Sequence, residues 1–177
     1  MKSPYKNAIR SRQLISQALI TLLDKKGSLD NITVSDICNE ANINRGTFYN
    51  HYGNPTDVLE EIKESLMNKL TTTLKVSAEK KDINCLVDSA IEHLQTNDNA
   101  YRKIVKAIPM SVIEKLKQEF ITQINSFRFN IDPITLTFVV NGISGFYFDF
   151  LKGNIDISYD KLKIKTKEFI NKNICMQ

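Results

Sequence analysis

Five polar side chains fall within seven consecutive residues of this sequence: Arg45, Thr47, Tyr49, Asn50 and His51. An arginine side chain can donate two parallel hydrogen bonds to guanine, and an asparagine side chain can pair in the same way with adenine. These residue types at this spacing therefore have the chemistry needed to read the edges of DNA bases.

The backbone around these side chains is predicted to be helical from residue 45 to residue 52. Phe48 and Tyr52 are four residues apart and so share one face of a helix, which we expect to point into a hydrophobic core. Asn44 is a favourable N-cap for this helix. The polar side chains then lie on the outward face, where they can contact a partner.

A second short helix, residues 34–41, is predicted immediately before it. Apolar residues recur there at i, i+3, i+4 and i+7, namely Val34, Ile37, Cys38 and Ala41. Thr33 and Asp36 resemble a capping box with aspartate in place of the usual glutamate or glutamine. Asn42 tolerates the left-handed conformation that ends a helix in a tight turn. Two short helices joined in this way form a helix-turn-helix unit.

Catalytic and metal chemistry find little support elsewhere in the chain. The two histidines, His51 and His93, have no carboxylate or nucleophile pattern around them, so we interpret His51 as a DNA contact and His93 as structural or exposed. The three cysteines, Cys38, Cys85 and Cys175, are far apart and form no C-x-x-C motif. We expect no enzyme activity, no metal and no cofactor, and the cysteine usage fits a reducing cytoplasm.

Positive charge is concentrated in the first third of the chain. The net charge is +4, and residues 1–55 account for +3 of it, with seven Lys or Arg against four Asp or Glu. Lys2, Lys6, Arg10 and Arg12 form a basic segment at the start of the first helix. Such a segment can follow phosphates or enter the minor groove, and the alternative is a solvated tail.

The apolar periodicity predicts an all-α protein of about nine helices. The predicted helices are residues 10–26, 34–41, 45–52, about 24 residues from Pro55, 82–96, a short one including 101–108, 110–127, 133–151 and 158–174. We divide the chain into a three-helix DNA-binding domain, 1–53, and a helical domain, 54–177. The polar N-terminus lacks the apolar core of a signal peptide. Residues 134–151 are apolar nearly all round, which indicates a core helix buried on two sides rather than a membrane span.

Residues 9–62 resemble the DNA-binding domain of the tetracycline-repressor-like (TetR) family of bacterial regulators. The resemblance rests on Ala18-Leu19-x-x-Leu22-Leu23, Ile32-Thr33-Val34-Ser35-Asp36-Ile37, Ala41-x-Ile43-x-Arg45-Gly46-Thr47-Phe48-Tyr49-x-His51-Tyr52, and Leu59. Residues 63–177 resemble the family only in their all-helical layout. This second half is short, and in that respect it is similar to the second half of small regulators that resemble the dihydroxyacetone-kinase operon regulator. Asn42 stands where glycine is common, and Pro55 stands where the family often has a phosphate-binding lysine.

The resemblance implies roles for particular residues. Thr47, Tyr49 and His51 would contact phosphates, which set register without reading sequence, and Arg45 and Asn50 would read bases. The full set of expected DNA contacts is Lys6, Arg10, Thr33, Val34, Asn44, Arg45, Gly46, Thr47, Tyr49, Asn50 and His51. The last two helices would pair with those of a second subunit. A pocket for an unidentified small-molecule effector would involve Tyr101, Met110, Phe120, Phe138 and Phe146.

The sequence therefore leads to the hypothesis of a homodimeric, ligand-responsive transcriptional regulator. It would act in the cytoplasm as a repressor on a near-palindromic, double-stranded operator, with no membrane partner. One alternative is a helix-turn-helix adaptor whose second domain binds a protein partner and no small ligand. An enzyme built on a helix-turn-helix-like bundle is the least supported alternative.

Overall fold

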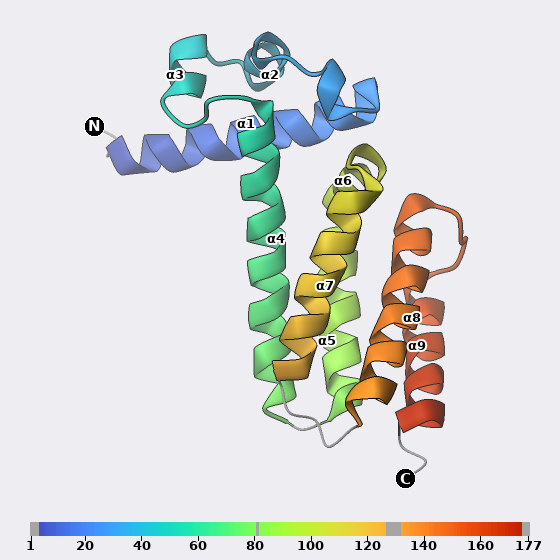
Figure 1. Ribbon diagram of the computed structural model, residues 1–177. Helices are drawn as coiled ribbons and strands as arrows, with labels where there is room; N and C mark the ends of the chain where they lie inside the picture. The colour runs from blue at the N-terminus through green and yellow to red at the C-terminus, as the bar shows by residue number, and fades with distance from the viewer. Residues whose placement is uncertain (1–3, 81, 127–131, 175–177) are drawn as a thin grey trace. The chain divides into compact units, whose positions relative to one another are not determined.

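The computed structural model describes residues 4–80, 82–126 and 132–174. Within these ranges the chain forms nine α-helices and one short 3-10 turn, Leu29–Asn31, as Figure 1 shows. The helices are α1 Pro4–Lys26, α2 Val34–Ala41, α3 Arg45–Tyr49, α4 Pro55–Ala78, α5 Ile83–Thr96, α6 Asp98–Ala107, α7 Met110–Ser126, α8 Pro133–Lys152 and α9 Tyr159–Ile174. The predicted all-α fold class is confirmed.

The start of α1 and the end of α3 differ most clearly from the sequence prediction. α1 begins at Pro4 rather than at residue 10, because proline suits the first turn of a helix and no breaker follows it before Gly27. α3 ends at Tyr49 rather than at residue 52. The carbonyl of Phe48 accepts hydrogen bonds from both His51 N, at 2.9 Å, and Tyr52 N, at 3.0 Å. This shared acceptor tightens the last turn, so residues 50–52 follow α3 as a turn rather than as regular helix.

The chain divides into two compact units, and the division falls inside α4. The first unit runs through Met67 and includes Lys106–Ile108, and the second comprises Asn68–Val105 and continues from Pro109. α4 therefore contributes its first half to one unit and its second half to the other. The predicted domain boundary between residues 53 and 54 stays a prediction.

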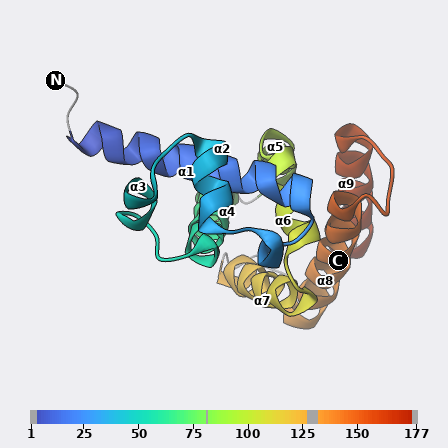
Figure 2. The ribbon, with the colours of Figure 1, turned by 90° about the horizontal axis from the view of Figure 1, so that it is seen from above.

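The first unit is built around α1, which packs against α2 and α3 (Figure 2). Five of its side chains are completely shielded from solvent, namely Ile15, Leu19, Ile37, Phe48 and Val58. They come from α1, α2, α3 and α4, so burial of apolar surface connects all four helices. The helix α3 owes its position to this core, because a helix of only five residues is not stable alone.

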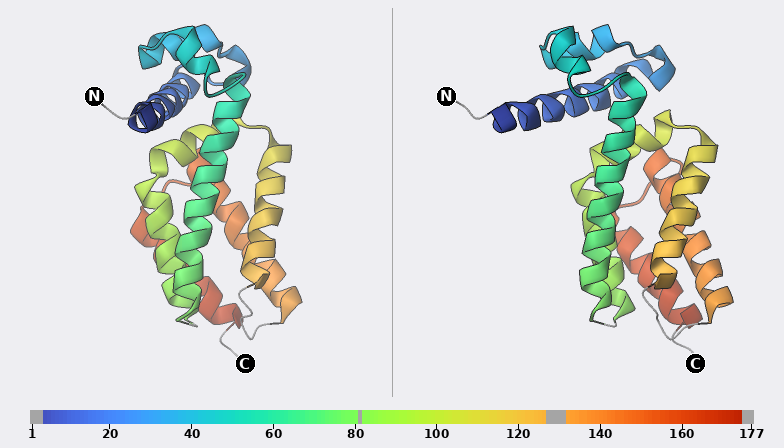
Figure 3. Two further views of the ribbon diagram at one scale, coloured as in Figure 1. Left: turned by 90° about the vertical axis from the view of Figure 1, so that its left-hand side faces the viewer. Right: turned by 60° about the vertical axis from the view of Figure 1, so that its left-hand side comes forward.

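The second unit, whose helices Figure 3 shows from two further sides, has its own apolar core formed by residues of four helices. Its central cluster consists of Leu70 and Leu74 of α4, Leu86 of α5, Ile121 of α7, and Leu136 and Val140 of α8. α9 packs against both α5 and α8. Lys167 of α9 forms a 2.6 Å ion pair with Asp88 of α5, and Tyr147 of α8 shares a 2.9 Å hydrogen bond with Thr166 of α9.

A polar cluster joins α6 to the end of α8 and the start of α9. Arg102 donates from Nη1 to the carbonyl of Phe150 at 3.0 Å and from Nε to Asp98 at 2.7 Å. The last carbonyls of a helix lack intrahelical partners and attract cations, so Arg102 stabilises the end of α8. The hydroxyl of Tyr159 donates to Asp98, and burial together with that carboxylate raises the pKa of Tyr159 above its ordinary value.

One face of α8 is apolar and remains exposed in the single chain. The exposed fractions of Ile134 and Phe138 are 68% and 75%, whereas Leu136 and Val140 on the opposite side are buried. By length and composition, α8 is apolar enough to cross a membrane. Only 28% of its most apolar stretch is buried within the chain. The sequence predicts that α8 is buried on two sides, but within a single copy only one of its sides is buried.

Candidate nucleic-acid interface

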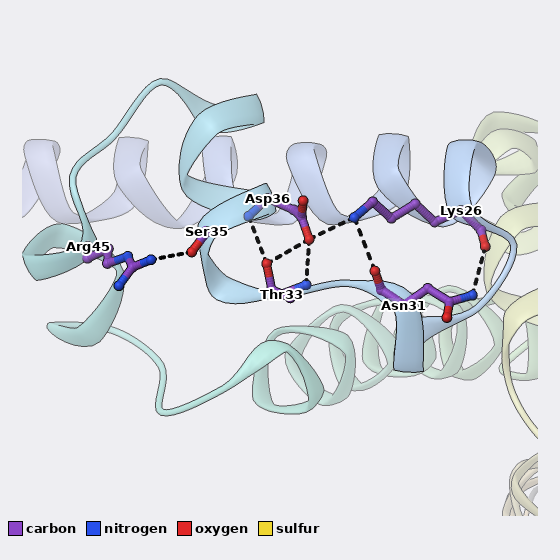
Figure 4. A network of polar contacts seen from close by, with 6 residues as sticks. All are labelled: Lys26, Asn31, Thr33, Ser35, Asp36 and Arg45. Atoms are coloured by element: carbon purple, nitrogen blue, oxygen red, sulfur yellow. Dashed lines mark hydrogen bonds and ion pairs between the residues drawn. The ribbon is translucent and has the colours of Figure 1, made fainter.

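The start of α2 is held by the capping box that the sequence predicts. Thr33 donates from its backbone N to Asp36 Oδ2 at 2.8 Å, and Asp36 donates from its backbone N to Thr33 Oγ1 at 3.2 Å (Figure 4). The Thr33 hydroxyl donates to the same carboxylate at 2.7 Å. These reciprocal bonds satisfy backbone donors that a helix start otherwise leaves open.

Lys26 connects this cap to the end of α1. Its ammonium group forms a 2.8 Å ion pair with Asp36 Oδ2 and donates to the carbonyl of Asn31 at 3.1 Å. Asn31 in turn donates from Nδ2 to the carbonyl of Lys26 at 3.3 Å, so the two residues bridge the turn before α2 (Figure 4). The hydrogen bond from Lys26, followed by those from Thr33, holds the pKa of Asp36 well below its ordinary value of 3.8.

The lowered pKa of Asp36 predicts an acid-dependent loss of stability. The ionised carboxylate contributes stability above about its unfolded-state pKa of 3.8, and that contribution disappears as the pH falls below this value toward the folded-state pKa. Asp36→Asn should therefore lower the melting temperature at pH 7, and the difference from wild type should shrink as the pH falls below about 4. Melting curves recorded from pH 2 to pH 7 test this, and a constant difference would contradict it.

The turn between α2 and α3 also follows the sequence prediction. Asn42 adopts the left-handed conformation, with φ 52° and ψ 51°. The Asn44 side chain caps α3, where its Oδ1 accepts hydrogen bonds from Thr47 N at 2.7 Å and from Thr47 Oγ1 at 3.0 Å. Asn44 and Thr47, both predicted DNA contacts, thus also fix the first turn of α3.

The outer surface of α3 and the turn after it carry the predicted polar set. Phe48 has no exposed surface and Tyr52 has 6%, as their spacing predicts, whereas Tyr49 is 57% exposed. Arg45, Gly46 and Asn50 are also exposed, and Thr47 and His51 are half-buried. The fold brings these groups together on one short segment, and their contact with DNA stays a prediction.

Arg45 has an intramolecular partner that the sequence did not indicate. Its Nη2 donates a hydrogen bond to the hydroxyl of Ser35, on the first turn of α2 (Figure 4). The two residues are ten positions apart and lie on different helices, so no local pattern points to the pair.

The backbone donors at the start of α2 differ in availability. The amide of Thr33 donates to Asp36, and the amide of Asp36 donates to Thr33. The amide of Val34, at the first helical position, has no intrahelical acceptor because a helix start leaves such donors open. Of the two predicted amide contacts, Val34 is thus the better placed for a phosphate oxygen.

From Pro4 onward the basic N-terminal segment is helical and not extended. Arg10 is exposed on α1, whereas Arg12 forms a 3.3 Å ion pair with Glu61 and lies 5.9 Å from the ring centre of Tyr52. The Tyr52 hydroxyl donates to Glu61 at 3.0 Å, and burial followed by this bond raises the pKa of Tyr52 to about 12. Arg12 therefore ties α1 to α4. Lys2 and the side chain of Lys6 lie outside the described parts of the chain.

The start of α4 has an acidic cap that sequence reasoning missed. Asp57 accepts hydrogen bonds from Gly53 N at 2.8 Å and from Asn54 N at 3.2 Å, and its own amide donates to Asn54 Oδ1 at 3.1 Å. The signal was present as an asparagine three residues before an aspartate, the same spacing as Thr33 and Asp36. With Pro55 in place of a lysine, this helix start presents a carboxylate, which is unfavourable for a phosphate.

Among the predicted effector-pocket residues whose side chains the structure describes, Tyr101 and Phe138 differ in their surroundings. The Tyr101 hydroxyl lies 3.1 Å from His93 Nε2, and both side chains are largely buried. Phe138 is exposed and lines an open depression of roughly 460 Å³ with Pro133, Ile134, Thr137 and Asn141. Phe146 is half-buried, and the side chains of Met110 and Phe120 lie outside the described ones.

Comparison with known proteins adds to this geometry. The family model for bacterial regulatory proteins of the tetR family matches residues 17–62. An uncharacterised helix-turn-helix transcriptional regulator, YxbF of Bacillus subtilis (strain 168), is 36% identical over 55 residues, which is 31% of this chain and 14% of that protein. The chain thus aligns with only a small part of the length of this relative.

Solved structures match over nearly the whole chain. A TetR transcriptional regulator from Streptococcus agalactiae 2603V superposes with a TM-score of 0.70 at 17% identity, covering 96% of both chains. The dihydroxyacetone kinase operon activator DhaS superposes with a TM-score of 0.57 at 17% identity, covering 92% of this chain and 96% of that one. At this identity the superpositions show the shared fold, and the family match covers the helix-turn-helix. Residues 17–62 thus match the tetR family of bacterial regulatory proteins, and the chain shares the fold of the superposed regulators.

Proposed function

We propose that the protein is a homodimeric, ligand-responsive transcriptional repressor that binds a near-palindromic DNA operator in the cytoplasm. The observation that carries the proposal is the outer surface of α3. Arg45 of α3 and Asn50, directly after it, can pair with base edges and are exposed, while Phe48 is fully buried. The capping bonds of Thr33 and Asn44 fix the two helices that carry this surface.

The exposed apolar face of α8 supports the homodimer. Ile134 and Phe138 on α8, and Phe169 on the adjacent α9, remain substantially exposed in one copy. Large exposed apolar side chains that gather on neighbouring elements are typical of an interaction surface. Pairing of α8 and α9 with the same helices of a second copy buries these side chains and gives two α3 segments in one assembly.

The second unit supports ligand response through its buried polar pair. His93 and Tyr101 form a hydrogen-bonded polar pair within the second unit, and small-molecule sites use a few such polar groups to orient a ligand. An effector can act only by binding the DNA-competent and DNA-free states with different affinity. Repression itself requires only that the dimer occupies the operator in one of those states.

Selection from a randomised duplex library followed by salt titration tests the DNA-binding proposal. The purified protein should enrich a near-palindromic duplex. If each dimer neutralises 6–10 phosphates, the affinity should fall by about 10³–10⁵ between 50 and 200 mM salt. Failure to enrich any duplex at low salt would contradict the proposed function.

A further inference from the structure

We propose that Ser35 is a positioning residue that orients Arg45 for base recognition, an inference that rests on the proposed function. Arg45 donates from Nη2 to the Ser35 hydroxyl, so α2 holds the end of a side chain that starts on α3. Arg45 is exposed, and Ser35 is half-buried on the first turn of α2. The bond fixes the direction of the guanidinium before any partner arrives.

The hydrogen-bonding capacity of arginine makes this arrangement compatible with base reading. A guanidinium group has five N–H donors, and Ser35 accepts from one of them. A bidentate contact to guanine needs two further donors, so Arg45 can keep its bond to Ser35 while it pairs with a base. Ser35 acts in this way through Arg45 and needs no DNA contact of its own.

Preorganisation gives the bond a functional consequence. A free arginine side chain loses much rotamer freedom when it is immobilised, and a side chain already held in place loses less on binding. This smaller loss of rotamer freedom favours only the base contact that Arg45 makes. Removing the Ser35 hydroxyl should therefore weaken discrimination at the base pair that Arg45 reads and leave the phosphate contacts unchanged.

The backbone around Ser35 and the backbone around Arg45 are each held by their own contacts. The Thr33–Asp36 capping box and the ion pair of Lys26 fix the turn of α2 on which Ser35 lies. The cap by Asn44 fixes the first turn of α3, where Arg45 begins. The bond between Ser35 and Arg45 therefore joins two elements that are each held independently.

The loss of discrimination is measured from the affinity of the protein for duplexes in which each base pair is substituted in turn, and these affinities together form a base-pair profile. The probe is the duplex that the wild-type protein enriches from a randomised library, together with single base-pair variants of it. Ser35→Ala should lower discrimination about three- to tenfold at the position where Arg45→Ala abolishes it, as expected for loss of one hydrogen bond. The salt slope should not change. Ser35→Thr, which keeps a hydroxyl, should restore discrimination.

Two further variants separate positioning from a structural effect. Ser65→Ala, an exposed serine on α4 in the same unit, should leave the profile unchanged. In the Arg45→Ala background, Ser35→Ala should cause no additional loss, because the two changes remove one shared interaction.

The outcomes distinguish this inference from the proposed function. A Ser35→Ala profile equal to that of wild type, a uniform loss over all base pairs, or a gain in affinity would overturn the positioning role while DNA binding stands. A wild-type protein that enriches no duplex would contradict the proposed function and the inference together.

Discussion

Arg45→Ala should abolish discrimination at one base pair of each half-site. A bidentate arginine–guanine contact is worth about 1–3 kcal/mol of discrimination. Because a dimer makes the contact twice, affinity for the selected duplex should fall by on the order of a hundredfold or more. The exposed position of Arg45 predicts no matching loss of stability, since substitutions at exposed sites cost little. Competition binding against duplexes substituted at each position gives the measurement.

Arg45→Lys is the control that separates charge from geometry. Lysine keeps the positive charge but lacks the planar group that makes two parallel hydrogen bonds. This variant should retain the salt dependence of wild type while it loses base discrimination. A lysine variant with the full wild-type profile would show that Arg45 acts only through its charge.

Phe138→Glu should convert the protein into a monomer in solution. Phe138 is 75% exposed in a single copy, so the change removes little from the chain's own core. In the proposed dimer the same change buries a carboxylate in an apolar contact, which is strongly unfavourable. Because linked binding modules gain about 10²–10⁴ in affinity over single ones, DNA binding should fall by a comparable factor. Sedimentation velocity and DNA titration of the same sample measure both effects.

Val76→Glu provides the matched control for this experiment. Val76 is an exposed apolar residue, with 60% of its surface accessible, and it lies on α4 rather than on α8 or α9. The same charge introduced there should leave the assembly state and the affinity unchanged. A Phe138→Glu protein that remains dimeric would exclude this face of α8 from the interface.

Features that depend on neighbours in the sequence were predictable. The Thr33–Asp36 box, the left-handed Asn42 and the Asn44 cap each rest on contacts across three or four residues. Burial of Phe48 and Tyr52 follows from helical spacing in the same way. Local backbone chemistry decides such features, so the residue types carry the information.

Features that depend on packing between distant segments were not predictable. The bond between Ser35 and Arg45 joins two helices, and the ion pair of Arg12 with Glu61 joins positions 49 residues apart. Arg12 belongs to a basic segment of the kind that contacts DNA, yet in the structure its ion pair connects α1 to α4. For the same reason, the apolar residue type of Phe138 did not indicate that its side chain is exposed.

The central claim is that two copies of α3 read two half-sites that lie about one DNA turn apart. It is tested most directly by inserting five base pairs between the half-sites of the selected duplex. The insertion turns the second half-site by about half a helical turn, so that the two major grooves face opposite sides. Affinity should then fall to the level of a single half-site. Equal affinity for the two duplexes would contradict the account.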